Sequence, residues 1–239
     1  MTSSPTDKPK RFYADATVEE IPGGWTVALD GRTIKTPARA ALCLPTQRLA
    51  RSVAAEWEAQ GDRIDLLSMH LTRLANVAID RTPELREEMA DELARYCETD
   101  LICHIAEGPE ELAEREEAYW RPVRDWAGQE LGILLVPVEG VLASPQPDAS
   151  LEAAREVALA MDDFRLTGTL FGCGLYGSAL LALAVAEEQL SAEDAFEVSR
   201  VDEAWQNEQW GEDEEAKAAT AARRIEAKAL NAWIRGLAG

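Results

Sequence analysis

The pattern of hydrophobic and polar positions divides the chain into two parts. Before about residue 80, short β-prone runs are separated by Gly and Pro; beyond it, nearly every segment carries apolar residues at helical spacing. This change predicts an α+β protein. A small N-terminal antiparallel β-rich domain is expected over residues 1–80, followed by a larger, mostly helical domain over residues 81–239. The boundary is placed within residues 75–90.

The first part begins with short alternating runs that predict strands. Asp30-Gly31 separates two of these runs, and both central positions of a tight hairpin turn take positive φ, which Asp and Gly tolerate. A hairpin is therefore expected at this dipeptide. The predicted strands cover residues 12–18, 24–30, 33–36 and 40–44.

Helical signals begin at Pro45-Thr46, where Thr46 is a typical N-cap, and Leu49, Val53 and Trp57 recur every four residues behind it. Ser191 and Asp194 form a second start signal, the capping box. Residues 136–147 contain three prolines and predict a connector with a short strand. The helices after the first are expected at about 71–78, 82–97, 110–130, 150–163, 176–190, 191–211 and 213–236.

The most distinctive stretch is an acidic one that contains tryptophans. Between Glu187 and Glu215 there are 12 Asp and Glu and a single basic residue, Arg200, and Trp205 and Trp210 interrupt the acids. Aromatic rings supply apolar contact area, while the carboxylates select a basic partner and speed its encounter. The stretch predicts a partner-binding helix. The alternative is a solvated helix face with two core-facing tryptophans.

The overall charge narrows the choice of partners. The net charge of −20 argues against nucleic acid and against anionic membrane surfaces, because both require Lys and Arg in excess. A protein with basic patches is the natural complement. Residues 166–186 lack a charge over a length that could span a membrane, but four glycines interrupt them, so a buried core helix is expected instead.

The compartment follows from the cysteines and the N-terminus. Residues 1–11 are polar and lack the apolar segment of a secretory signal, and they are not Arg-rich like a mitochondrial transit peptide. The cysteines do not form a disulfide-like framework. Reduced thiols in a reducing cytoplasm are expected for Cys43, Cys97, Cys103 and Cys173.

Two patterns could carry catalytic or cofactor chemistry. Gly172-Cys-Gly174-Leu-Tyr-Gly177 matches the G-x-G-x-x-G of dinucleotide-binding proteins, but no good strand precedes it and too few residues follow for the required sheet. Cys103-His104 with Cys97 lacks zinc-motif spacing, and His70 and His104 have no nucleophile motif near them. We expect no enzymatic activity, no cofactor and no metal.

Several blocks taken together resemble one protein family. Their order and spacing are similar to those of the assembly chaperones that bind the alpha subunit of F1-ATP synthase in mitochondria and alphaproteobacteria. The resemblance runs from about Phe12 to about Ala216. The blocks are residues 29–37, 49–57 with Gln60, 69–80, 96–101 with Cys103, 120–122 with Trp126, and Asp202-Glu203-Ala-Trp-Gln206 with Gln209-Trp210-Gly211.

The resemblance implies a non-enzymatic chaperone that binds the free alpha subunit and prevents its aggregation until the beta subunit replaces it. It also implies that an acidic residue in the last block is critical, which we carry to Glu203, with Asp202 as the neighbouring alternative in register. Trp205 stands where the family usually has Tyr. The expected partner-binding residues are Asp202, Glu203, Trp205, Gln206, Glu208, Trp210 and Gly211.

Two other functions stay open at this point. One is a small nucleotide-binding enzyme that uses the Gly172–Gly177 loop, and the other is an acidic scaffold for a different basic protein. In either chaperone or scaffold, a surface made for a client need not be self-complementary, so a monomer is expected.

Overall fold

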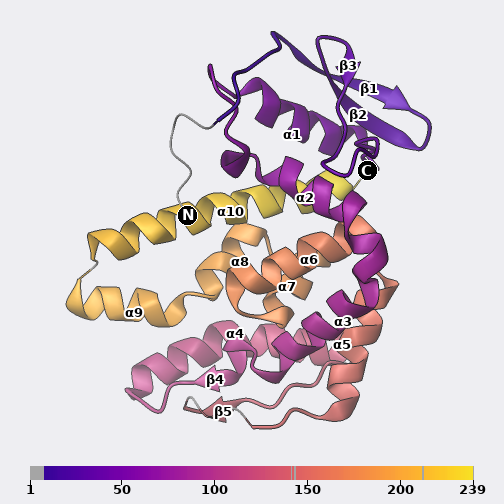
Figure 1. Cartoon of the computed structure of the whole chain (residues 1–239). Coiled ribbons are helices and arrows are strands. Elements are labelled where there is room, and N and C mark those ends of the chain that lie inside the picture. The colour runs from indigo at the N-terminus through magenta and orange to yellow at the C-terminus, as the bar shows by residue number, and fades with distance from the viewer. Residues whose placement is uncertain (1–7, 141, 143, 212, 239) are drawn as a thin grey trace. The chain divides into compact units, whose positions relative to one another are not determined.

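The computed structural model describes residues 8–140, 142, 144–211 and 213–238 and divides into two compact units (Figure 1). The first contains residues up to Glu84 together with the chain from Ala232 onwards, and the second contains Leu85–Asn231. A three-stranded antiparallel sheet lies in the first unit, and helices dominate the second. The predicted α+β class is confirmed.

The sheet of the first unit has the strand order β1 (Ala16–Ile21), β2 (Gly24–Leu29), β3 (Arg32–Thr33). The hairpin predicted at Asp30-Gly31 is confirmed: the two residues have φ values of 49° and 76°, and Leu29 pairs with Arg32 across the turn. Positive φ at both positions is what keeps the loop to two residues.

The strand predicted at residues 12–18 was wrong at its start, because β1 begins only at Ala16. The backbone N–H groups of Ala14 and Asp15 donate to Asp30 Oδ1, both at 3.0 Å, and so hold this segment through a side chain. Likewise, residues 40–44 form only isolated bridges, Lys35 with Ala41 and Trp25 with Leu44, rather than a strand.

Helix α1 (Gln47–Glu58) packs against β1 and β2 (Figure 1). Its predicted N-cap is confirmed, since Thr46 Oγ1 accepts the N–H of Leu49 at 3.1 Å. The Thr46 hydroxyl also donates to the carbonyl of Gly236, near the end of the last helix. A Cβ on Gly236 would lie 3.0 Å from Leu49 Cδ1, so a glycine permits this close packing.

Five of the remaining helices begin and end within three residues of their predicted ranges, and two regions depart from the prediction. In chain order they are η1 (Leu66–Ser68), α2 (His70–Asp80), α3 (Thr82–Glu98), η2 (Leu101–Cys103), β4 (His104–Ile105), α4 (Glu110–Glu130), β5 (Val138–Glu139), α5 (Asp148–Ala160), α6 (Asp163–Tyr176), α7 (Ala179–Ala186), α8 (Ala192–Val198), α9 (Val201–Trp210) and α10 (Glu214–Leu237).

The first departure is α6, which lies between the helices expected at 150–163 and 176–190, although a buried core helix was expected within residues 166–186. Glycines and threonines weaken its helical signal, but Asp162 caps it by accepting the N–H groups of Phe164 and Arg165, both at 2.9 Å. Gly177 ends α6 with φ 68°, so the helix expected at 176–190 is shortened to α7. Tertiary packing overrides the low propensity of α6.

The second departure divides the helix expected at 191–211 into α8 and α9. The capping box at its start is confirmed, because Ser191 Oγ accepts the N–H of Asp194 at 3.0 Å. The helical path is interrupted at Ser199-Arg200, where Arg200 has φ −121° and ψ 24°. The turn gives α9 a direction of its own (Figure 1).

Helix α7 forms the centre of the second unit, and all eight of its residues are buried. It packs against α6, where a Cβ on Gly172 would lie 3.1 Å from Ala182 Cβ. The uncharged stretch 166–186 is thus core, as predicted. Among the described residues, no helix combines the length and apolarity needed to cross a membrane.

Asp100 connects the start of η2 to the start of α7. Its carboxylate is fully buried, and it accepts the N–H of Ile102 at 3.2 Å and that of Leu180 at 3.0 Å. These bonds fix the segment that begins at Leu101.

We expect Asp100→Ala to lower the free energy of unfolding by about 3 kcal/mol, because it leaves two buried backbone donors unpaired. Urea denaturation monitored by circular dichroism measures the change. Asp91→Ala removes an exposed carboxylate that pairs with Arg155 and is the control, with an expected loss below about 1 kcal/mol. Equal losses in the two variants would contradict this role of Asp100.

Candidate functional site

The predicted binding residues lie on α9 and at its end. Asp202 and Glu203 stand in the first turn, where carboxylates complement the positive end of the helix dipole. Gly211 ends the helix with φ 85°, and its N–H donates to Asn207 O at 2.9 Å. Here glycine serves as a helix stop, which positive φ makes favourable.

One face of α9 packs into the protein, and the adjacent face borders a cleft. Val201 is buried and anchors the helix. Asp202, Trp205, Gln206 and Trp210 follow at three- and four-residue spacing and all line the cleft. The structure therefore brings together four of the seven predicted residues.

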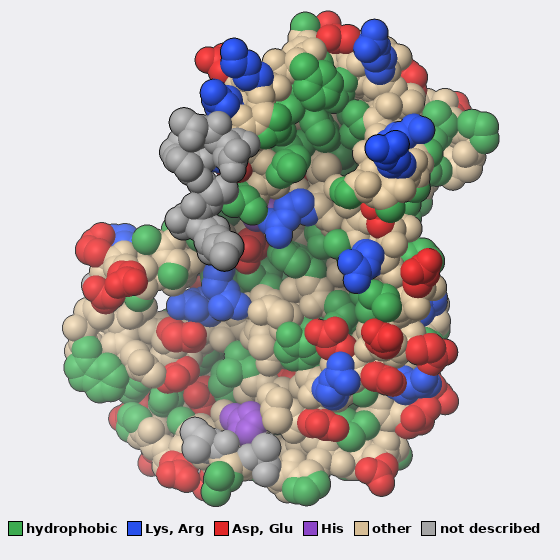
Figure 2. Space-filling model, viewed as in Figure 1, with side chains coloured by type: hydrophobic (Ala, Val, Ile, Leu, Met, Phe, Trp, Pro, Cys, Tyr) green, Lys and Arg blue, Asp and Glu red, His purple; other side chains and the backbone are tan. Residues whose placement is uncertain are grey.

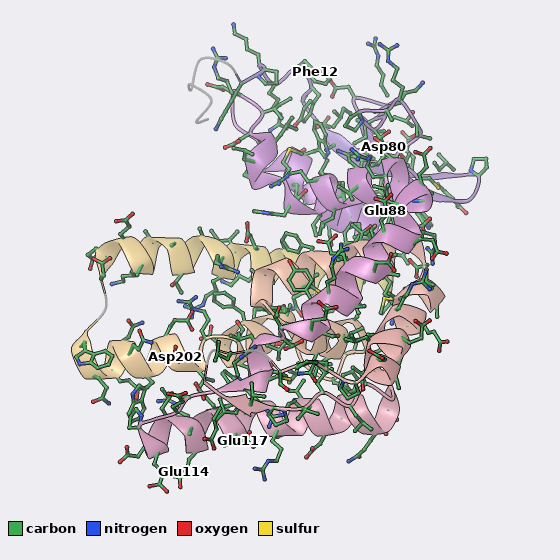
Figure 3. The ribbon with its side chains drawn as sticks, turned by 60° about the horizontal axis from the view of Figure 1, so that its bottom comes forward. Phe12, Asp80, Glu88, Glu114, Glu117 and Asp202 are labelled. Carbon is green, nitrogen blue, oxygen red and sulfur yellow. The ribbon has the colours of Figure 1, made fainter. Side chains whose placement is uncertain are left out.

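The cleft has a volume of about 510 Å³ and lies between α9, α4 and the segment that contains β4. Helix α4 runs beside α9, and Figure 3 shows Asp202 on α9 with Glu114 and Glu117 on α4. Aromatic and apolar groups dominate its floor, with Trp120 fully buried. The residues that line it are Leu101, His104, Ile105, Ala106, Glu107, Gly108, Pro109, Leu112, Glu116, Trp120, Gly140, Asp202, Trp205, Gln206 and Trp210.

Glu116 is the unexpected residue of the cleft. It is only 2% exposed, and its Oε2 accepts the N–H of Ala106 at 2.7 Å. Burial raises the pKa of this carboxyl, the N–H of Ala106 opposes that effect, and the negative charge of Asp202 raises the pKa further. Sequence reasoning missed Glu116 because it is one of many glutamates in α4. The available signal was its position four residues from both Leu112 and Trp120, on the buried face.

Asp202 lines the cleft, and its side-chain partner among the described residues is an amide. Gln206 Nε2 donates to both carboxylate oxygens at 3.0 Å, across one helical turn. The predicted acid and the predicted glutamine thus form one unit. Among the described residues, Asp202 forms no ion pair, so its charge is balanced only by this amide and by the helix N-terminus.

Glu203, Glu208 and Gly211 do not line this cleft. Glu203 is about half exposed and pairs with Arg200, with Nη1 and Oε1 3.3 Å apart. Glu208 accepts two bonds from Arg115 of α4, at 2.8 and 2.9 Å, which hold α9 against α4. The guanidinium of Arg115 lowers the pKa of Glu208.

Trp210 is the most exposed of the tryptophans that line the cleft, with 78% of its surface accessible to solvent. Trp205 is partly buried. The alternative reading of two core-facing tryptophans is wrong for Trp210, because the last turn of α9 leaves its ring in solvent. An exposed ring of this size beside a cleft is typical of a contact residue.

The negative charge of the protein is concentrated in the second unit. Residues 85–231 contain 33 Asp and Glu against 12 Lys and Arg, a net charge of −21, whereas the rest of the chain has a net charge of +1. Acidic side chains are numerous on the helices of this unit in Figure 2. The field around α9 therefore attracts basic partners.

The glycine pattern considered for nucleotide binding has no phosphate-loop geometry. Gly172 and Gly174 lie inside α6, and Gly177 ends that helix, so the segment does not connect a strand to a helix N-terminus. Cys97 and Cys103 are buried, and burial raises the pKa of both thiols. In the part of the chain that the structure describes, no group of three His, Cys, Asp or Glu is arranged to hold a metal ion.

Comparisons with known proteins give consistent matches over most of the chain. A sequence model of the family described as ATP12 chaperone protein matches residues 10–128, which end before α9. The mitochondrial protein atp12 of Schizosaccharomyces pombe is 25% identical over 232 residues, which cover 90% of this chain and 78% of that protein.

Two crystal structures match a larger part of the chain than the family model does. Atp12 from Paracoccus denitrificans is 38% identical, with a TM-score of 0.85 and coverage of 96% of this chain and 97% of that chain. The Atu1473 protein from Agrobacterium tumefaciens is also 38% identical, with a TM-score of 0.89 and coverage of 96% and 86%, respectively.

Proposed function

Because this chain belongs to the ATP12 chaperone family, whose members serve the assembly of ATP synthase, we propose that it binds the free alpha subunit of the F1 sector. It holds this subunit in solution until the beta subunit takes its place. The chain acts by binding alone, without catalysis. It does so as a monomer in the bacterial cytoplasm.

The observation that carries the proposal is the arrangement of α9. Asp202, Trp205, Gln206 and Trp210 come together at one cleft, in the unit that holds the negative charge of the protein. Exposed aromatic surface flanked by carboxylates suits a subunit face that is apolar and partly basic while its neighbour is missing.

A second groove supports the same helix as a contact surface. It has a volume of about 500 Å³ and lies along α9 on the side of Val201 and Ala204. Tyr119, which is 51% exposed, and Leu190 contribute to it. Two grooves along one short helix offer a client more contact area than either alone.

The test is co-expression of this chain with the alpha subunit, with and without the beta subunit. We expect a complex with alpha alone that purifies through an affinity tag on this chain and is released when beta is present. Charge attraction predicts weaker capture as salt rises from about 50 to 300 mM.

Two results would contradict the proposal. One is the absence of a complex at both low and moderate salt. The other is equal capture of an unrelated basic protein, which would favour an acidic scaffold without a dedicated client.

A further inference from the structure

The cleft beside α9 has an unbalanced charge. Its lining includes three carboxylates, Glu107, Glu116 and Asp202, but none of its described lining residues is Lys or Arg. Two other glutamates of these helices have cationic partners: Glu117 pairs with Arg121 and Arg124, and Glu208 pairs with Arg115. The three carboxylates that line the cleft form no ion pair with another described residue.

Glu116 is the most buried of the three carboxylates in the cleft, so its negative charge has little contact with water. Its side chain is more than nine-tenths buried, and its Oε2 accepts the N–H of Ala106 at 2.7 Å. The carboxylate forms no ion pair with another described residue. A mostly buried carboxylate without an ion pair has lost part of its hydration, and an incoming cation would replace that lost interaction.

The aromatic residues that line the cleft favour a guanidinium over an ammonium group. Trp205 and Trp210 provide aromatic faces beside Asp202 and Glu116. A guanidinium stacks on indole rings and gives paired N–H bonds to carboxylates, whereas an ammonium is a compact and strongly hydrated charge. The volume of about 510 Å³ is in the usual range of about 300–1,000 Å³ for small-ligand sites. A long side chain and its neighbours fit such a space.

We propose that the cleft between α4, α9 and residues 101–109 is a receptor for an arginine side chain of the bound client, with Glu116 and Asp202 as acceptors and Trp205 and Trp210 as aromatic walls. The inference rests on the proposed function for the identity of the client, but the recognition of arginine is tested without it. Gln206 positions the Asp202 carboxylate by its two hydrogen bonds.

The first experiment uses arginine amide as the probe. Titration of the full chain is followed by the indole N–H signals in nitrogen-15 NMR spectra, which are assigned with Trp205→Phe and Trp210→Phe. Citrulline amide is the matched neutral probe. We expect arginine amide to shift the signals of Trp205 and Trp210 and citrulline amide to leave them in place, and we expect Glu116→Gln to abolish the shift.

The second experiment measures the affinity for the alpha subunit. We expect Glu116→Gln and Asp202→Asn each to raise Kd roughly 30-fold, because each leaves a desolvated guanidinium with one acceptor fewer. The control is Glu114→Gln, a glutamate on α4 outside the cleft (Figure 3), with an expected change below about twofold. The melting temperature of Glu116→Gln should equal or exceed that of the original chain, since a mostly buried charge without an ion pair is removed and the amide oxygen can still accept the N–H of Ala106.

The outcomes separate the two ideas. Capture of alpha that is unaffected by Glu116→Gln and Asp202→Asn would overturn the arginine receptor and leave the proposed function intact. Binding of arginine amide without any capture of the alpha subunit would overturn the proposed function and leave the arginine receptor intact. Equal shifts with citrulline amide, or loss of binding by Glu116→Gln together with a lower melting temperature, would also overturn the receptor.

Discussion

Glu203→Lys is expected to abolish co-purification of this chain with the alpha subunit while leaving its circular dichroism spectrum unchanged. Glu203 is about half exposed and its ion pair is with Arg200, one turn away, so the fold loses little when the pair is removed. The substitution places the ammonium group of a lysine next to Asp202 in the first turn of α9. The new lysine also replaces the ion pair between Glu203 and Arg200 with a repulsion between two positive charges. A basic client is then repelled where it was attracted.

The matched control for charge is Glu156→Lys on α5. Glu156 is exposed and lies away from the cleft, and its replacement changes the net charge by the same amount. We expect this control to bind the alpha subunit as the original chain does. Unchanged binding by Glu203→Lys would contradict the assignment of Glu203 as a residue that binds the alpha subunit. Loss of binding with an altered spectrum would make Glu203 a structural residue.

Trp120→Ala is expected to lower the free energy of unfolding by about 4 kcal/mol, the usual cost of deleting a fully buried indole. Trp120 is 2% exposed, and its Nε1 donates to Val198 O at 2.9 Å, which ties α4 to the end of α8. Its loss leaves both a cavity and an unpaired carbonyl beneath the cleft. At roughly 2–4 °C per kcal/mol, the melting temperature falls by about 10 °C.

Trp210→Ala is the control for stability, because the ring of Trp210 is mostly in solvent. Its unfolding free energy should change by less than about 0.5 kcal/mol. Guanidinium denaturation of both variants, followed by circular dichroism, gives the comparison. Similar losses in the two would show that Trp120 contributes no more to the core than an exposed ring does.

Local sequence signals predicted much of the fold. Thr46, Ser191 and the Asp30-Gly31 turn each act through atoms within a few residues, so their roles can be derived without the rest of the chain. The class, the order of most elements and the helix that holds the predicted binding residues came from such signals. They did not give the bounds of α6 or its separation from α7, because α6 has low helix propensity and is stabilised by packing against α7.

The candidate site could be predicted only in part. The sequence indicated α9, and four of its predicted residues line one cleft. It gave no means of separating Asp202 from Glu203, since adjacent residues on a helix differ by about 100° in direction and the break at Arg200 sets that direction. Glu116 could not be distinguished from the other glutamates of α4 without knowing which face is buried.

By itself the sequence determined the acidity of this protein, its local turns and caps, its α+β class and its resemblance to a family of assembly chaperones. Only the tertiary structure decided that Glu116, which lies 86 residues before Asp202, shares a cleft with it. It also decided that the last helix ends beside Thr46. The physical reason is range: caps and turns are satisfied by neighbouring residues, whereas burial and charge balance depend on segments that meet only when the chain is folded.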